Sequence, residues 1–214
     1  MTRSWFAQLP SDVQQQLQRI ARERQLTAGE VLFHRGDRFD GIYLLQRGLI
    51  LISGVNRQGN EALLTVLEAG AMFGEIALFD GEPRTHDAIA AQDCQLLQFP
   101  ALALQQLLKQ QPGYWQWLGQ LLTAKMRQVF AAMEQHTLLD AKARLYWRLL
   151  QLCPDDGAYL PLSQQQLAQL LGISRQSTNQ LLQALARQGV IQLGYGALEL
   201  KDRALLQQLL QQLD

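Results

Sequence analysis

Residues 163–185 read SQQQLAQLLGISRQSTNQLLQAL, the pattern of two short helices joined by a tight turn. Ser163 followed by Gln166 predicts a capping box at the start of the first helix. Gly172 stands where the chain must turn, and Ser174 is expected to cap the second helix. Small or apolar residues fall at the inward-facing positions, namely Leu167, Ala168, Leu171, Ile173, Thr178 and Leu181. The pattern predicts a helix-turn-helix.

The residues that follow predict a wing. Val190–Leu193 and Ala197–Leu200 read as two strands, and Gly194-Tyr195-Gly196 joins them as a hairpin. In such a unit the second helix enters the major groove of DNA, and its first turns face the edges of the bases. Double-stranded DNA is therefore the expected partner.

The candidate DNA-binding side chains are polar but carry little charge. Arg can bind guanine through two hydrogen bonds, and Gln or Asn can bind adenine in the same way. The residues expected to face bases are Arg175, Gln176, Asn179 and Gln180. Ser174 and Ser177 can reach phosphates, and Ser163 is a further DNA-binding candidate.

The alternative is that these side chains only solvate a helix. Residues 157–198 contain Arg175 and Arg187 but no acidic residue, which favours a nucleic-acid partner over that alternative. Because a charge of +2 is small, one copy of the unit should bind DNA weakly, and two copies should have to bind together.

Upstream of this motif, from Leu26 to Phe99, short β-rich runs alternate with glycines. The runs are Glu30–His34, Gly41–Leu45, Leu49–Ser53, Ala62–Leu67, Ala88–Ala90 and Cys94–Phe99. This spacing predicts an antiparallel barrel or roll. A short amphipathic helix over residues 11–25, capped by Ser11, is expected to precede the roll.

Two more helices are predicted between the roll and the helix-turn-helix. The first begins at Pro100, carries Leu104, Leu107 and Leu108 on one face, and ends at Pro112-Gly113. The second runs from residue 114 to about 135 and places a narrow apolar seam on one face, formed by Leu118, Leu122, Met126, Val129 and Met133. A seam this narrow favours a coiled-coil contact between two copies of the chain, with packing against the roll as the alternative.

We therefore predict an α+β chain of two domains. The first, residues 1–136, is an effector-sensing antiparallel β-roll with a dimerisation helix at about 114–135. The second, residues 137–214, is a winged helix-turn-helix that binds DNA, and the hinge between the domains lies near residues 136–140.

A candidate anion site lies within the roll, where residues 73–85 read FGEIALFDGEPRT. Gly74 allows the backbone to approach a small anion, and a short helix starting near Glu75 offers free N–H groups. Arg84 can pair with two oxygens of a phosphodiester, and Thr85 can donate a hydroxyl hydrogen bond.

This stretch resembles the phosphate-binding cassette of cyclic-nucleotide-binding domains. With the roll, the long helix and the winged helix-turn-helix, the chain resembles the CRP/FNR family of bacterial transcription regulators from end to end. The resemblance implies a homodimer on a palindromic DNA operator, a cyclic nucleotide effector (cyclic AMP or cyclic GMP) and contact with RNA polymerase. It also implies that Glu75 takes the ribose 2′-hydroxyl. The effector-binding candidates are Gly74, Glu75, Ile76, Ala77, Arg84 and Thr85.

Some residues depart from the family pattern. Val129 and Phe130 stand where the cyclic-AMP-binding relative has a Thr-Ser pair, so the base contact is expected to be apolar or absent. His86 and Asp87 follow the cassette, and Asp87 would oppose a phosphate unless it points outward or pairs. A structural alternative to effector binding is an ion pair between Glu75 and Arg84 that holds an empty roll together.

Other classes of protein fit the sequence less well. The iron–sulfur sensors of the family need a cysteine cluster near the N-terminus, but the first cysteine here is Cys94. A haem held by His34, His86 or Cys94 is a minor alternative, because lone histidines are usually ordinary polar residues. We find no nucleophile elbow, metal-ligand pair or P-loop, so no catalytic or metal-binding residue is expected. A DNA-binding scaffold without any effector stays an open alternative.

Composition agrees with a globular regulator. The 214 residues include 19 Lys and Arg against 19 Asp and Glu, and 48% are hydrophobic, which is ample for a core. No export or membrane-spanning segment is visible, so we expect a cytoplasmic protein without a membrane partner.

Overall fold

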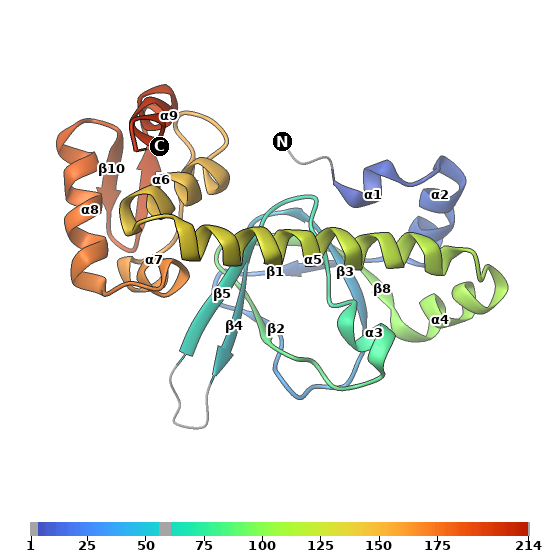
Figure 1. Cartoon of the computed structure of the whole chain (residues 1–214). Coiled ribbons are helices and arrows are strands. Elements are labelled where there is room, and N and C mark those ends of the chain that lie inside the picture. Colours follow the sequence, from blue (N-terminus) through green and yellow to red (C-terminus); the bar gives the residue numbers. More distant parts are fainter. Residues whose placement is uncertain (1–3, 56–60, 214) are drawn as a thin grey trace. The chain divides into compact units, whose positions relative to one another are not determined.

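The computed structural model describes residues 4–55 and 61–213. Contacts divide the chain into two compact units, Met1–Arg127 and Gln128–Asp214. The first unit contains α1 (Trp5–Gln8), α2 (Ser11–Ile20), β1 (Arg22–Leu26), β2 (Val31–Phe33), β3 (Gly41–Arg47), β4 (Ile50–Val55), β5 (Glu61–Leu67), β6 (Met72–Phe73), α3 (Ile76–Asp80), β7 (Asp87–Ala90), β8 (Cys94–Pro100) and α4 (Ala101–Gln110). Helix α5 (Tyr114–Leu138) begins in the first unit and ends in the second, which continues with α6 (Ala141–Leu152), β9 (Tyr159–Leu160), α7 (Gln164–Leu171), α8 (Arg175–Arg187), β10 (Ile191–Gly194), β11 (Ala197–Leu200) and α9 (Arg203–Gln211) (Figure 1).

Two four-stranded antiparallel sheets form the roll of the first unit. Their strand orders are β1-β8-β3-β6 and β2-β7-β4-β5. The predicted α+β class with an antiparallel roll, a long helix and a winged helix-turn-helix is confirmed. Each predicted strand is present, with ends that differ by at most two residues.

The sequence prediction was wrong at the start of the roll. The helix expected over residues 11–25 ends at Ile20, and the next residues form β1. Ser11 is the first helical residue, while Pro10 is the N-cap. The first four side chains of β1 are exposed, so the strand shows no apolar alternation. Its backbone pairs with β8, from Arg22 opposite Gln98 to Leu26 opposite Cys94, and this tertiary pairing makes it a strand.

The core of the first unit has two parts. Between the sheets, the rings of Phe33, Tyr43 and Phe73 pack with centroids 5.6–6.3 Å apart. A second apolar cluster joins α2, α4 and the first turns of α5. It includes the predicted face of α4, formed by Leu104, Leu107 and Leu108, together with Leu118 and Leu121 of α5. Leu118, the first residue of the predicted seam, is thus part of the core of its own roll.

The second unit is a winged helix-turn-helix. Ser163 forms the predicted capping box with Gln166, and Ser174 caps α8 by accepting from the backbone N–H of Ser177. Gly172 ends α7 at φ +65°, a conformation that favours glycine. In Figure 1, α8 runs beside β10 of the wing.

Helix α8 faces the core slightly differently from the prediction. Thr178, Leu182 and Leu185 are buried, whereas Leu181 is only half-buried. The inward line of the helix therefore passes through Leu182, one residue later than the pattern indicated. This rotation is small enough to leave the polar residues of the first two turns on the outer side.

The last turns of α5 pack within the second unit. Arg144 Nη1 donates to the carbonyls of His136 and Leu139, both at 3.0 Å. A Cβ on Gly172 would lie 2.7 Å from Cε1 of His136, so this ring sits directly on the turn between α7 and α8. These contacts place residues 128–138 with the winged unit, ahead of the boundary that the sequence suggested near residues 136–140.

No helix in the described part of the chain has both the length and the hydropathy needed to cross a membrane.

Candidate functional site

Gly74 brings Arg84 against the backbone of the roll. Gly74 lies between β6 and α3 at φ +85°, and its carbonyl accepts from Arg84 Nη1 at 2.7 Å. A Cβ at this position would lie 2.8 Å from that nitrogen. Glycine is therefore required both by the left-handed backbone and by the close approach of the guanidinium.

Arg84 is a buried cation with internal acceptors. Only 4% of the residue is exposed, and its guanidinium lies 4.3 Å from the centre of the Phe33 ring. Nη2 donates to the carbonyl of Gly41 at 2.6 Å and to the carboxylate of Asp40. The predicted phosphate-binding group thus faces a carboxylate of its own chain.

Asp40 joins Arg84 to a polar network at the edge of the aromatic core. Its second oxygen accepts from the hydroxyl of Tyr43 and, at 3.1 Å, from Gln98 Nε2. Burial and the hydrogen bond to Asp40 raise the pKa of Tyr43, so its hydroxyl stays protonated as a donor. About half of the Asp40 side chain is exposed, so this carboxylate can reach water as well as Arg84.

Glu75 is paired with α5. Its carboxylate is buried, with 2% of the residue exposed, and accepts from Lys125 Nζ at 2.7 and 2.8 Å. The Glu75–Arg84 ion pair that the sequence left as an alternative is wrong, because each residue has a different partner. The cassette is therefore attached to the long helix by a buried ion pair.

Replacing Lys125 by Met should leave the Glu75 carboxylate buried without a cation. We expect the free energy of unfolding to fall by about 2 kcal/mol, below the cost for a fully buried pair because the lysine side chain is 30% exposed. Urea denaturation at one fixed protein concentration measures this. The double variant Glu75→Gln with Lys125→Met should recover most of the loss, and equal stabilities of wild type and Lys125→Met would show that the pair does not stabilise the fold.

The other cassette residues differ in their surroundings. Ile76 is exposed and Ala77 is buried, while the exposed Thr85 has its hydroxyl 2.8 Å from His86 Nδ1. Asp87 does not stand free near the anion site, because it accepts from the backbone N–H of Arg35 at 2.9 Å. Of the six effector-binding candidates, the structure brings Gly74 and Arg84 into direct contact.

The histidines and cysteine considered as haem ligands have ordinary surroundings. His34 Nδ1 donates to Asp87 at 3.1 Å. Burial, followed by the charge of Arg35, lowers the pKa of His86. Burial raises the pKa of the Cys94 thiol, which disfavours the thiolate that a metal would need. Within residues 4–55 and 61–213, no three His, Cys, Asp or Glu side chains cluster in a way that could hold a metal ion.

The polar face of α8 forms a shallow surface concavity. It is lined by the four residues predicted to face bases, Arg175, Gln176, Asn179 and Gln180. Three of them are exposed, but Asn179 is half-buried and its Nδ2 donates to Oε1 of Gln164 on α7 at 3.0 Å. The concavity therefore offers one exposed guanidinium and two exposed amides to a ligand.

The serine candidates are partly committed to caps. The hydroxyl of Ser163 donates to Gln166 Oε1 at 3.0 Å, so its proton is used within the capping box. The hydroxyl oxygens of Ser174 and Ser177 lie 2.9 Å apart, and one proton lies between them. The other proton of that pair stays free for an acceptor such as a phosphate oxygen.

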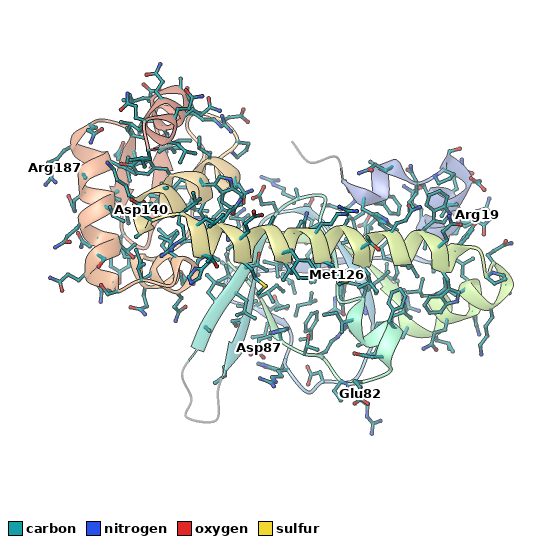
Figure 2. The ribbon with its side chains drawn as sticks, viewed as in Figure 1. Arg19, Glu82, Asp87, Met126, Asp140 and Arg187 are labelled. Carbon is teal, nitrogen blue, oxygen red and sulfur yellow. The ribbon has the colours of Figure 1, made fainter. Side chains whose placement is uncertain are left out.

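The predicted seam is exposed over its second half. Leu118 is buried and Leu122 half-buried, whereas Met126, Val129 and Met133 are 58%, 58% and 61% exposed. Met126 is labelled on α5 in Figure 2. Phe130, beside the seam, is also exposed. Apolar side chains exposed in a row along one helix favour a protein partner.

Sequence reasoning missed Asp40, Lys125 and Gln164. Asp40 and Lys125 lie 44 and 50 residues from their ion-pair partners, and no local spacing connects them. Gln164 was hidden among the glutamines that open α7. A signal was available for Lys125, because it is a cation on the long helix one residue before the seam residue Met126.

Comparisons with known proteins agree with this arrangement. A family model described as a cyclic nucleotide-binding domain matches residues 23–111, and a Crp-like helix-turn-helix domain matches residues 143–209. The chain is 30% identical over 182 residues to the cyclic AMP receptor protein of Thermus thermophilus, covering 85% of this chain and 84% of that protein. It is 25% identical over 179 residues to the cAMP-activated global transcriptional regulator Vfr of Pseudomonas aeruginosa, covering 78% and 84%. A solved CRP/FNR-family transcriptional regulator from Thermus thermophilus has a TM-score of 0.72 at 27% identity, covering 90% of this chain and all of that one.

Proposed function

Because the chain belongs to the CRP/FNR family of transcription regulators, with a cyclic nucleotide-binding domain and a helix-turn-helix domain, we propose that it acts as a homodimer on a palindromic DNA site. The observation that carries this proposal is the polar outer face of α8, on which Arg175, Gln176 and Gln180 are exposed. The relatives are transcription regulators and not enzymes, so the polar groups of the roll have a binding role.

The low charge of the helix-turn-helix and its wing favours binding as two copies on one DNA. Residues 157–198 contain two arginines and no acid, so one copy neutralises few phosphates and binds weakly. Two copies joined along α5 would present two α8 helices to half-sites about one helical turn apart. RNA polymerase is the further partner that a transcription regulator of this kind would contact.

Arg175→Ala is expected to weaken binding to a specific duplex by about 1–3 kcal/mol and to relax the preference at one base pair. The duplex is selected in vitro with the wild-type protein from random palindromes, and fluorescence anisotropy gives the dissociation constants. Arg187→Ala is the matched control, because Arg187 has the same charge and is exposed at the other end of α8. Equal weakening on all base-substituted duplexes would identify Arg175 as a phosphate contact.

For the roll, we propose a cyclic nucleotide as the effector, with its phosphate at Arg84 and its ribose hydroxyl at Glu75. The nucleotide can bind only if it exchanges with contacts inside the chain. Its phosphate would replace Asp40 as the partner of Arg84, and its hydroxyl would share Glu75 with Lys125. The second exchange reaches α5, the helix proposed to pair with its copy. An effector with different affinities for two arrangements of the dimer would then shift the population between them.

Calorimetric titration with cyclic AMP and with cyclic GMP tests the effector. Heat of binding and a higher melting temperature with one of them would support the proposal. The alternative is a DNA-binding scaffold whose roll binds no effector, and one observation favours it: both Arg84 and Glu75 already have internal counterions. If neither nucleotide gives heat of binding or raises the melting temperature, the result favours that alternative.

A further inference from the structure

A hydrogen bond between side chains joins the two helices of the helix-turn-helix. Asn179, in the second turn of α8, donates from Nδ2 to Oε1 of Gln164, the first residue of α7, at 3.0 Å. Both side chains are half-buried. Arg175, Gln176 and Gln180 differ from Asn179, because within the described residues their side chains have no such bond and are exposed.

The bond leaves Gln164 with donors to spare. It uses the carbonyl oxygen of the Gln164 amide, whereas the two N–H groups of Nε2 have no acceptor among the residues that the structure describes. The neighbouring hydroxyl of Ser163 has its proton on Gln166. Gln164 is thus a side chain at this end of α7 that α8 orients and whose N–H groups stay free.

We propose that Asn179 is a positioning residue, which holds Gln164 so that its Nε2 donates to a phosphate of DNA bound along α8. This inference rests on the proposed DNA-binding function. In a helix-turn-helix the first helix crosses the DNA backbone while the second reads bases, so the start of α7 lies where phosphates pass. Base choice then falls to Arg175, Gln176 and Gln180, and Asn179 contributes affinity without sequence preference.

A double-mutant cycle on DNA binding tests the proposal. The probes are the duplex selected with the wild-type protein and a set of duplexes with single base-pair substitutions. Asn179→Ala and Gln164→Ala should each weaken binding about tenfold, by the same factor on every duplex. The double variant should lose about tenfold rather than a hundredfold, because both substitutions remove one contact.

Gln164→Glu provides a charge test. The carboxylate still accepts from Asn179 but lacks donors and repels a phosphate, so this variant should bind DNA more weakly than Gln164→Ala. Equal or tighter binding by Gln164→Glu would overturn the phosphate contact. A changed base preference in Asn179→Ala, or losses that multiply to about a hundredfold in the double variant, would overturn the positioning role.

The test separates this inference from the function on which it rests. If selection with the wild-type protein recovers no duplex, the proposed DNA binding fails. If the duplex is recovered and Arg175→Ala weakens binding to it, a double-mutant cycle that contradicts the expected losses rejects only the role of Asn179. Circular dichroism melts of each variant show that the helix-turn-helix is folded, as expected for half-buried side chains at the start of one helix and in the second turn of the other.

Discussion

Replacing Arg84 by Leu should reduce binding of the proposed cyclic nucleotide effector below detection in calorimetry and also lower the free energy of unfolding by about 2–4 kcal/mol. The loss of binding follows from removal of the cation that would pair with the phosphate. The loss of stability follows from burial, because the carbonyls of Gly74 and Gly41 would lose their donor at Nη1 and Nη2. The internal contacts of the guanidinium therefore make Arg84→Leu a test of stability as well as of binding.

Asp40→Asn is the control for this prediction. It keeps the guanidinium and its two carbonyl acceptors but removes the carboxylate that faces Nη2. We expect the nucleotide to bind several-fold more tightly, because the phosphate would no longer compete with an anion of the same chain. If Arg84→Leu at a temperature where it is folded binds like the wild type, and Asp40→Asn changes nothing, the effector does not bind at the cassette.

The helix-turn-helix was predictable because its determinants are local. Ser163 and Gln166 cap one helix three residues apart, and Gly172 supplies the left-handed turn nine residues after Ser163. The strands bounded by glycine were predictable for the same reason, since the apolar runs and turn residues are neighbours in sequence. Local sequence preference did not predict β1, because its polar residues form a strand only through backbone pairing with β8.

The sequence located the candidate effector site, but it did not predict which groups neutralise the charged residues of that site. The spacing in residues 73–85 identifies Glu75 and Arg84, but not the groups that neutralise them. Asp40 precedes β3 and Lys125 lies on α5, so only the folded chain brings these counterions into contact with the cassette. Long-range ion pairs leave no periodicity in the sequence, which is why a Glu75–Arg84 pair stayed an alternative until the structure showed the actual partners.

The second large effect is expected from Met133→Glu, which should convert the proposed dimer into a monomer and weaken binding to the selected palindrome by about a hundredfold or more. Met133 is 61% exposed in the single chain, so the substitution should not disturb its fold. In a dimer paired along α5, the same position would bury two carboxylates against an apolar seam, at a high desolvation cost. Each winged unit would then bind its half-site alone.

Gln128→Glu is the matched control, because it makes a carboxylate at an exposed position on the same helix but away from Met126, Val129 and Met133. Sedimentation equilibrium at about tens of micromolar protein measures the oligomeric state, and anisotropy with the palindrome and with a single half-site measures affinity. We expect Gln128→Glu to stay dimeric and to prefer the palindrome, and Met133→Glu to bind both duplexes equally weakly. A wild-type protein that is monomeric at this concentration, or a dimeric Met133→Glu variant, would contradict pairing along α5. The exposed apolar row on α5 would then point to a different protein as its partner, because exposed apolar rows mark interaction surfaces. Such a partner would also have to strengthen DNA binding, since the two arginines of residues 157–198 carry too little charge for tight binding by one copy.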